Sequence, residues 1–235
     1  QANTTGNNNT AIGRLALFAN STASDNTSVG KSSLTANTTG ASNTALGSRA
    51  LGSNTTASNN TAVGRDALFA NTTGASNTAV GKSAGAAVTT GIQNTLIGAL
   101  AGDALTDADF NVAMGISALT TDTLGSKSTA LGSYALQNQN FTSATDAHNT
   151  AVGNNAGGAV TTGVQNTLVG SLAGDAITTG SENTAVGYRA LSTEDGNGLN
   201  TAIGVDSLMT QNAGANAYNT AVGYHSGKLV TTGVQ

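Results

Sequence analysis

Glycine recurs along this chain at a nearly constant interval, and that interval constrains the fold more than any other feature. Eight glycines from Gly13 to Gly132 follow one another at steps of 17 residues. Five more, from Gly153 to Gly223, continue the series with one step of 21 and one of 19. Each of these phrase glycines ends the same short phrase, as in Asn77-Thr78-Ala79-Val80-Gly81. A fixed period this short is typical of a solenoid with one coil per repeat, so the sequence predicts thirteen stacked coils.

The residues before each phrase glycine predict a short β-strand. The position directly before it is aliphatic in all thirteen copies, and the third position before it is threonine in every copy except Val112. An alternating, β-branched run that ends in glycine is typical of a strand that enters a turn. We expect a second short strand after the glycine, and hence an all-β parallel β-solenoid of 17-residue coils. At about 4.8 Å per coil, such a stack would form a rod roughly 60 Å long.

In the segment that follows the phrase glycine, large and small residues alternate between two positions according to the type of coil. Eight coils have leucine four residues after it and a polar residue three positions later, whereas five coils have glycine and then an aliphatic residue, as in Gly85 and Val88. Close-packed interiors conserve volume, so both positions are expected to face the core. The glycine-type coils begin in pairs at Gly81 and Gly153. We therefore interpret residues 1–235 as a single solenoid segment cut from a longer fibre, with a four-coil super-repeat from about residue 81.

The two sides of the predicted strand are both apolar. The aliphatic residue before the phrase glycine is expected to point into the coil, and the alanine before it, present in ten coils, to point outward. Because so few large aliphatic side chains per coil oppose the entropy of ordering the backbone, further apolar surface should be buried between chains. The alanine side is the expected contact face between neighbouring chains, and an ordinary solvent-facing alanine row is the alternative.

Composition argues against several classes of function. The chain lacks cysteine, which excludes disulfides and thiolate metal sites, and its net charge of −4 is not that of a nucleic-acid-binding protein. No apolar run is long enough for membrane insertion. Gly81-Lys82-Ser83 lacks the first glycine of a phosphate-binding loop, and a calcium-loop-like start at Asp107, Asp109 and Asn111 lacks the required glycine and glutamate. We expect no enzyme activity, no cofactor and no metal.

The fourth position before the phrase glycine is asparagine in every coil except that of Ser128. Amide side chains stacked at strand spacing form hydrogen-bonded ladders, so this row is predicted to stabilise the turn. The predicted ladder consists of Asn9, Asn26, Asn43, Asn60, Asn77, Asn94, Asn111, Asn149, Asn166, Asn183, Asn200 and Asn219.

The two long steps supply the candidate contact residues for a ligand. They are Asn140, Phe141, Asp146 and His148 in the 21-residue step and Tyr218 in the 19-residue step. Polar loops that carry an aromatic residue on a rigid scaffold suit contact with a glycan or a receptor. Insertions that the fold merely tolerates are the alternative.

Basic residues concentrate just after the phrase glycine. Six of the eight lie one or two positions beyond it: Arg14, Lys31, Arg49, Arg65, Lys82 and Arg189. We expect a solvated stripe that is able to meet acidic residues of a neighbouring chain, and binding of a polyanion is the second interpretation.

The repeated phrases resemble those of a known group of surface proteins. Asn60-Thr61-Ala62-Val63-Gly64, then Ala67-Leu68, then Asn71-Thr72-Thr73-Gly74 is similar to the head repeats of YadA-like trimeric autotransporter adhesins. It is also similar to the longer repeats of phage tail fibres and of bacterial tail-fibre-domain surface proteins. The resemblance implies a left-handed parallel β-roll and three chains side by side in an extracellular fibre. The adhesin repeat is shorter, which implies that one loop is enlarged here.

Together these features predict a non-catalytic structural shaft or adhesin segment of a cell-surface or virion appendage. The expected partner is the chain itself, as a homotrimer or a longer filament, with a cell-surface glycan or protein receptor as a second partner. An ice-binding solenoid is an alternative because threonine recurs regularly, although that threonine shares a strand face with the aliphatic residue expected inside. A polysaccharide-degrading spike would need carboxylates that converge on one groove.

Overall fold

Short parallel strands, one per coil, build the structure and confirm a parallel β-solenoid of about 13 turns with about 17 residues per coil. The computed structural model describes residues 3–233, and it contains no helix within them. The chain divides into two compact units, residues 1–111 and residues 112–235.

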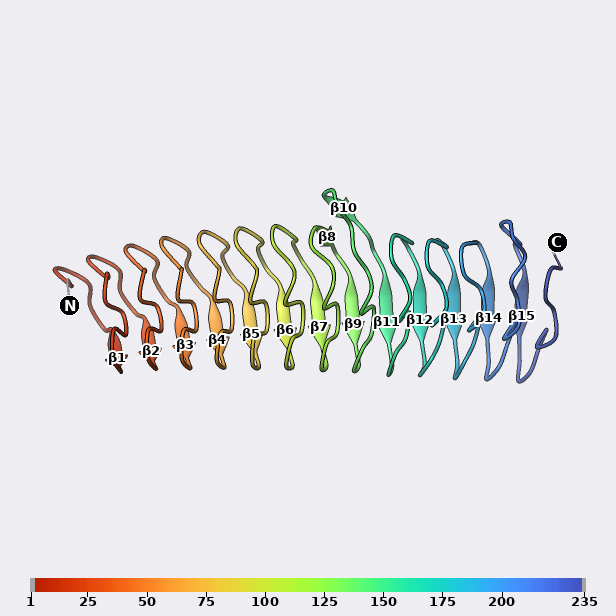
Figure 1. Cartoon of the computed structure of the whole chain (residues 1–235), viewed down its shortest axis with the longest axis horizontal. Coiled ribbons are helices and arrows are strands. Elements are labelled where there is room, and N and C mark those ends of the chain that lie inside the picture. The colour runs from red at the N-terminus through yellow and green to blue at the C-terminus, as the bar shows by residue number, and fades with distance from the viewer. Residues whose placement is uncertain (1–2, 234–235) are drawn as a thin grey trace. The chain divides into compact units, whose positions relative to one another are not determined.

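In the first unit six strands lie side by side in chain order, as Figure 1 shows at its red-to-yellow end. They are β1 (Thr10–Ile12), β2 (Thr27–Val29), β3 (Thr44–Leu46), β4 (Thr61–Val63), β5 (Thr78–Val80) and β6 (Thr95–Ile97). Equivalent residues pair directly, so that Thr61 lies opposite Thr78 and Val63 opposite Val80. Every coil of this unit therefore repeats its side chains in register with the next.

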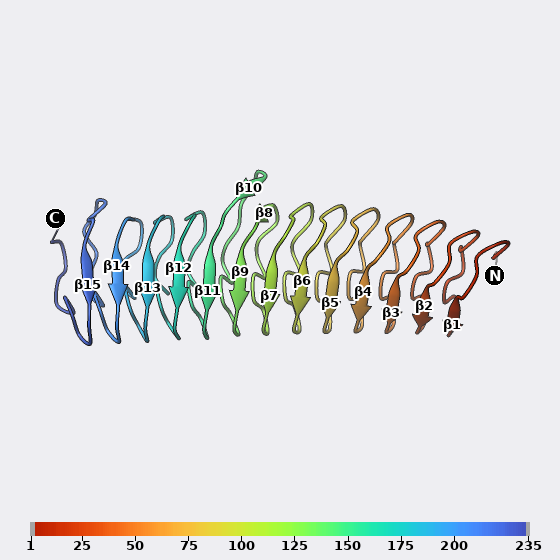
Figure 2. The same ribbon diagram turned by 180° about the vertical axis from the view of Figure 1, so that it is seen from behind.

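The second unit contains the remaining strands. Its main sheet is formed by β7 (Val112–Met114), β9 (Thr129–Leu131), β11 (Thr150–Val152), β12 (Thr167–Val169), β13 (Thr184–Val186), β14 (Thr201–Ile203) and β15 (Thr220–Val222). A small second sheet pairs β8 (Gly125–Ser126) with β10 (Thr145–Asp146). The loop that leads into β10 projects beyond the other turns of this unit in both views (Figures 1 and 2). Register survives this insertion, because Thr129 still lies opposite Thr150.

The two sides of the strands are the reverse of our expectation. The middle residue of each strand after β1 is buried, and alanines such as Ala45, Ala62 and Ala202 are fully inaccessible. The aliphatic residue that follows points outward, so that Leu46 is 46% exposed and Ile203 is 38% exposed. The prediction that the aliphatic row fills the core and the alanine row faces a neighbouring chain was therefore wrong.

The inward side chain of the strand is small because the interior of the coil is narrow. This side chain lies directly against the leucine position on the other side of the same coil. Leu96 replaces alanine in β6, and its coil and the preceding coil are both of the glycine type. A Cβ atom added to Gly85 or to Gly102 would lie 2.7 Å from a methyl group of Leu96. Leu168 has the same relation to Gly157 and Gly174. The alanine and leucine positions thus share one interior space, and a large side chain fits at only one of them.

Both exchangeable positions face this interior, as predicted. Leu17 and Leu68 represent the leucine-type coils and Val88 and Leu105 the glycine-type coils, and all four are fully buried. The polar residues that follow the leucines, such as Asn54, are buried as well.

The segment after the phrase glycine is a series of turns, so the predicted second strand is absent from the described coils. Leu68 adopts φ of 48°, yet its N–H still donates to the Ala84 carbonyl of the next coil at 3.0 Å. The phrase glycines adopt φ values such as +135° at Gly64, where an added Cβ would lie 2.3 Å from the Gly81 carbonyl oxygen. Backbone touches backbone at this corner, which explains why glycine recurs there.

Candidate functional site: the outer face of the sheet

The exposed side of each main sheet carries threonine and aliphatic side chains, and we call this surface the outer face. It follows from the alternation of a strand, because the first and third residues point away from the buried middle residue. In the first unit the outer face consists of Thr10, Thr27, Thr44, Thr61, Thr78 and Thr95 beside Ile12, Val29, Leu46, Val63, Val80 and Ile97. These residues are exposed or half-buried.

The second unit has an outer face of the same chemistry. It consists of Val112, Thr129, Thr150, Thr167, Thr184, Thr201 and Thr220 beside Met114, Leu131, Val152, Val169, Val186, Ile203 and Val222. Neither outer face includes a charged residue. Parallel sheets are normally covered on both faces, so an uncharged, aliphatic face of this kind is the surface most suited to a partner.

The asparagine row forms a buried ladder on the inward side of the coils, opposite to the outer face. Asn60 is fully inaccessible, its Nδ2 donates to the Gly74 carbonyl at 2.9 Å, and its Oδ1 accepts the Asn77 N–H at 2.9 Å. The same N–H to Oδ1 bond joins successive members from Asn9 to Asn111 in the first unit and from Asn149 to Asn219 in the second. These residues therefore bind the backbone of their own chain and present no amide to a ligand.

A second ladder was missed by the sequence reasoning. Asn37 Nδ2 donates to Asn20 Oδ1, Asn54 to Asn37 and Asn71 to Asn54, at 2.8–3.2 Å. It ends where the coil type changes, because Val88 takes the next place and Asn71 Oδ1 has no hydrogen-bond partner. The polar residue three positions after each leucine was the available signal, and its burial shows that it belongs to the interior.

The base of the projecting loop in the 21-residue step packs against its own unit. Phe141 is only 6% exposed, so our expectation that it contacts a ligand was wrong. A Cβ added to Gly125 would lie 2.7 Å from the Phe141 ring, and the Phe141 N–H donates to buried Asp122 at 3.1 Å. Asn140 is half-buried and accepts a hydrogen bond from Thr123 Oγ1 at 3.1 Å. The exposed tip consists of residues 142–144, which carry small side chains.

The other candidate contact residues lie elsewhere in their coils. Exposed Asp146 belongs to β10 and forms an ion pair with Lys127 at 2.5 Å. His148 and Tyr218 both occupy the regular turn position directly before a ladder asparagine, with φ of 51° and 55°. Both are exposed, but they are members of a position present in every coil and not of a projecting insertion.

Two of the six basic residues near the phrase glycines, Arg49 and Arg189, pair with an acidic residue of the next coil in the same chain. Arg49 Nε lies 2.6 Å from Asp66, and Arg189 lies 2.9 Å from Asp206. Lys228 at 2.9 Å and His225 at 3.2 Å also contact Asp206. The hydrogen bond from Lys228, together with Arg189, holds the pKa of the Asp206 carboxyl below its usual value. These contacts stabilise the stack of coils.

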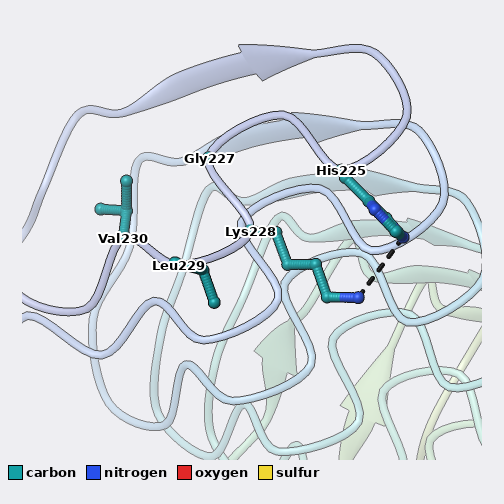
Figure 3. A pocket seen from close by; sticks show the side chains of 5 residues that line it. All are labelled: His225, Gly227, Lys228, Leu229 and Val230. Carbon is teal, nitrogen blue, oxygen red and sulfur yellow. Dashed lines mark hydrogen bonds between the residues drawn. The ribbon is translucent and has the colours of Figure 1, made fainter.

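A hollow in the last described coil is lined by His225, Gly227, Lys228, Leu229 and Val230 (Figure 3). Lys228 Nζ lies 3.3 Å from His225 Nε2 across it. Both nitrogens also contact the Asp206 carboxylate, which Arg189 contacts as well. The hollow brings together neither a nucleophile with a base nor a pair of carboxylates.

The motif-like strings of the sequence do not assemble into sites. Asp109 accepts the Ile92 N–H at 2.7 Å, and Asn111 is buried in the ladder, so the calcium-loop-like residues do not converge. Within residues 3–233, no group of three metal-ligating side chains is placed to hold an ion. That part of the chain also has no helix with the length and apolarity of a membrane span.

Comparisons of the chain with protein-family models, with curated proteins and with solved structures found no match. Function is therefore inferred from the geometry of the coils themselves.

Proposed function

We propose that this chain is a shaft segment of an extracellular fibre whose outer faces pack against copies of the same chain. The observation that carries the proposal is the uncharged, threonine-and-aliphatic outer face, which extends over every strand of each main sheet. Aliphatic side chains such as Leu46 and Met114 lie exposed on it, and burying them is favourable at roughly 25 cal/mol per Å².

A second copy of the chain is the partner that best fits this face. Its side chains repeat once per coil in strict register, and another copy presents the same repeat. Most soluble oligomers are closed and symmetric, and three copies can turn their outer faces toward one axis. The left-handed winding and the homotrimer implied by the resemblance to fibre proteins are part of this proposal. So is a location on a cell surface or virion appendage, where the loop tip at residues 142–144 would meet a glycan or a protein receptor.

Sedimentation of the full chain tests the proposal directly. A homotrimer that persists at micromolar concentration is the expected result. A species that sediments as a monomer at every concentration would contradict the proposal. The second observable is the burial of the outer face, which hydrogen exchange of the strand amides and binding of an apolar dye both report.

Ice binding remains a second candidate because of one observation. The threonine and the aliphatic residue of a strand both point outward, so the regular threonine row, interrupted at Val112, lies on the exposed side of the strands. Our objection that this threonine shares its face with a core residue is therefore removed. Self-association in a shaft and binding to ice would both use the outer face. Thermal hysteresis by a monomeric chain would favour ice binding over self-association.

A further inference from the structure

One edge of the first unit carries a row of cations beside the phrase glycines. We call Arg14, Lys31, Arg65 and Lys82, which directly follow their phrase glycines, the basic ridge. All four are exposed. Their carbonyl groups each accept an N–H from the next coil, as from Ser32 to Arg14 at 2.9 Å, which holds the row in register. At about 4.8 Å per coil the ridge spans roughly 19 Å, interrupted only by Ser48.

The charge of the ridge is not balanced within the chain. Among the described residues, Arg14, Lys31 and Lys82 form no ion pair. Arg65 contacts Asp66 at 3.2 Å, but this carboxylate is shared with Arg49. Like charges on neighbouring coils repel each other, so the row costs stability unless an anion accompanies it.

The coil itself does not require a cation at this position. In the second unit the residues that directly follow the phrase glycines are Ile116, Ser133, Asn154, Ser171, Tyr188, Val205 and Tyr224. The same backbone geometry therefore accepts neutral residues of many sizes. The basic ridge is a property of the first unit alone.

Another copy of the chain does not supply the complementary charge. In both units the acidic residues of neighbouring coils fall at different positions and form no row: Asp25, Asp66, Asp103, Asp107 and Asp109 in the first, and Asp122, Asp146, Asp175, Glu182, Glu194, Asp195 and Asp206 in the second. A straight line of cations instead matches a linear polymer with one acidic group on each unit.

We propose that the basic ridge binds a linear acidic polysaccharide that lies along the stacking direction of the first unit. A nucleic acid fits less well, because no aromatic side chain alternates with the cations to stack on bases. The ridge residues are not part of the outer face, so the two contacts use different side chains.

Binding of the full chain to immobilised polygalacturonate, which carries a carboxylate on every sugar, tests the proposal. We expect binding at low salt that weakens as salt rises, and none to neutral dextran. Lys31→Ser with Lys82→Ser should weaken binding roughly tenfold, whereas Ser48→Arg, which fills the gap in the row, should strengthen it. Serine occurs naturally at this position in Ser48, Ser133 and Ser171, so these changes suit the coil.

A relocation variant provides the matched control. Lys31→Ser and Lys82→Ser combined with Ser133→Lys and Ser171→Lys keep the net charge and move two cations to the second unit. Binding as tight as that of the wild type would show that net charge suffices and would overturn the proposal. Tighter binding of double-stranded DNA than of polygalacturonate, or no effect of Ser48→Arg, would overturn it too. Sedimentation of the same variants reports self-association separately.

Discussion

Leu96 occupies the space in which a side chain at Gly85 would have to begin, since a Cβ there would lie 2.7 Å from Leu96 Cδ1. The backbone at Gly85 has φ of +57°, but leucine adopts nearly the same angle at Leu68 and Leu51. Conformation is therefore not what excludes a larger residue at Gly85. The space is already filled, and the two positions are coupled through it.

Gly85→Leu is expected to destabilise the protein by overpacking, and Leu96→Ala by leaving a cavity, at about 2–5 kcal/mol for the cavity. The double variant places a leucine side chain in the space that Leu96 has vacated, while Val88, which a leucine-type coil lacks, stays in place. Its loss in free energy of unfolding should be smaller than the sum of the losses in the two single variants, by roughly 0.5–3 kcal/mol. Urea unfolding of the four proteins measures this coupling, and strictly additive values would contradict the shared space.

Asn60→Asp should destabilise the ladder by about 1–3 kcal/mol, because a buried amide donor to the Gly74 carbonyl is replaced by an acceptor. Asn59→Ser is the matched control at the exposed turn position directly before it, where Ser42 and Ser76 occur naturally. Thermal unfolding of both variants provides the comparison. Equal midpoints for the two would show that the ladder contributes nothing to stability.

Leu46→Lys combined with Val63→Lys should abolish self-association and leave the coil folded. Both side chains point outward, and a desolvated ammonium is costly in an apolar contact. Ser76→Lys is the control, since Lys127 occupies the same turn position in another coil. Sedimentation measures the assembly and circular dichroism the fold. If the double variant assembles as the wild type does, the outer face is not the contact surface.

Asp175→Asn should stabilise the protein at neutral pH. Burial raises the pKa of the Asp175 carboxyl above its ordinary value of 3.8, and its Oδ1 has no hydrogen-bond partner. A folded-state pKa above the unfolded one means that stability is fully present below the unfolded pKa and is lost as pH rises through the folded one. Urea midpoints across the acidic range should therefore show a fall with rising pH that the variant lacks. An identical pH profile for both proteins would exclude this role for Asp175.

The spacing of glycine was enough to predict the coil, its length and the direction of the strands. The exchange between Leu68-type and Val88-type positions was enough to predict two core positions. The side of the strand that faces inward was not predictable from alternation, because both sides are apolar and alternation says only that they differ. The occurrence of Leu96 and Leu168 next to glycine-type coils did indicate which side faces inward. A large residue at an alanine position needs the space that glycine leaves at the leucine position.

The loop residues show a different limit. An aromatic residue in a polar insertion suggested a contact site, yet Phe141 packs over Gly125. This contact joins positions sixteen residues apart whose alignment depends on the insertion itself. No periodicity describes it, and only the three-dimensional structure reveals that the aromatic residue secures the loop.

The crowded glycine corner has a consequence for how such chains can change length. An added Cβ would meet the next coil's carbonyl oxygen at 2.4 Å both for Gly132, before the 21-residue step, and for Gly204, before the 19-residue step. Extra residues have thus been accommodated without disturbing that corner. Foreign peptides inserted at residues 142–144 should therefore be tolerated as well, because the glycine corner keeps the coils on either side of the loop at their normal spacing.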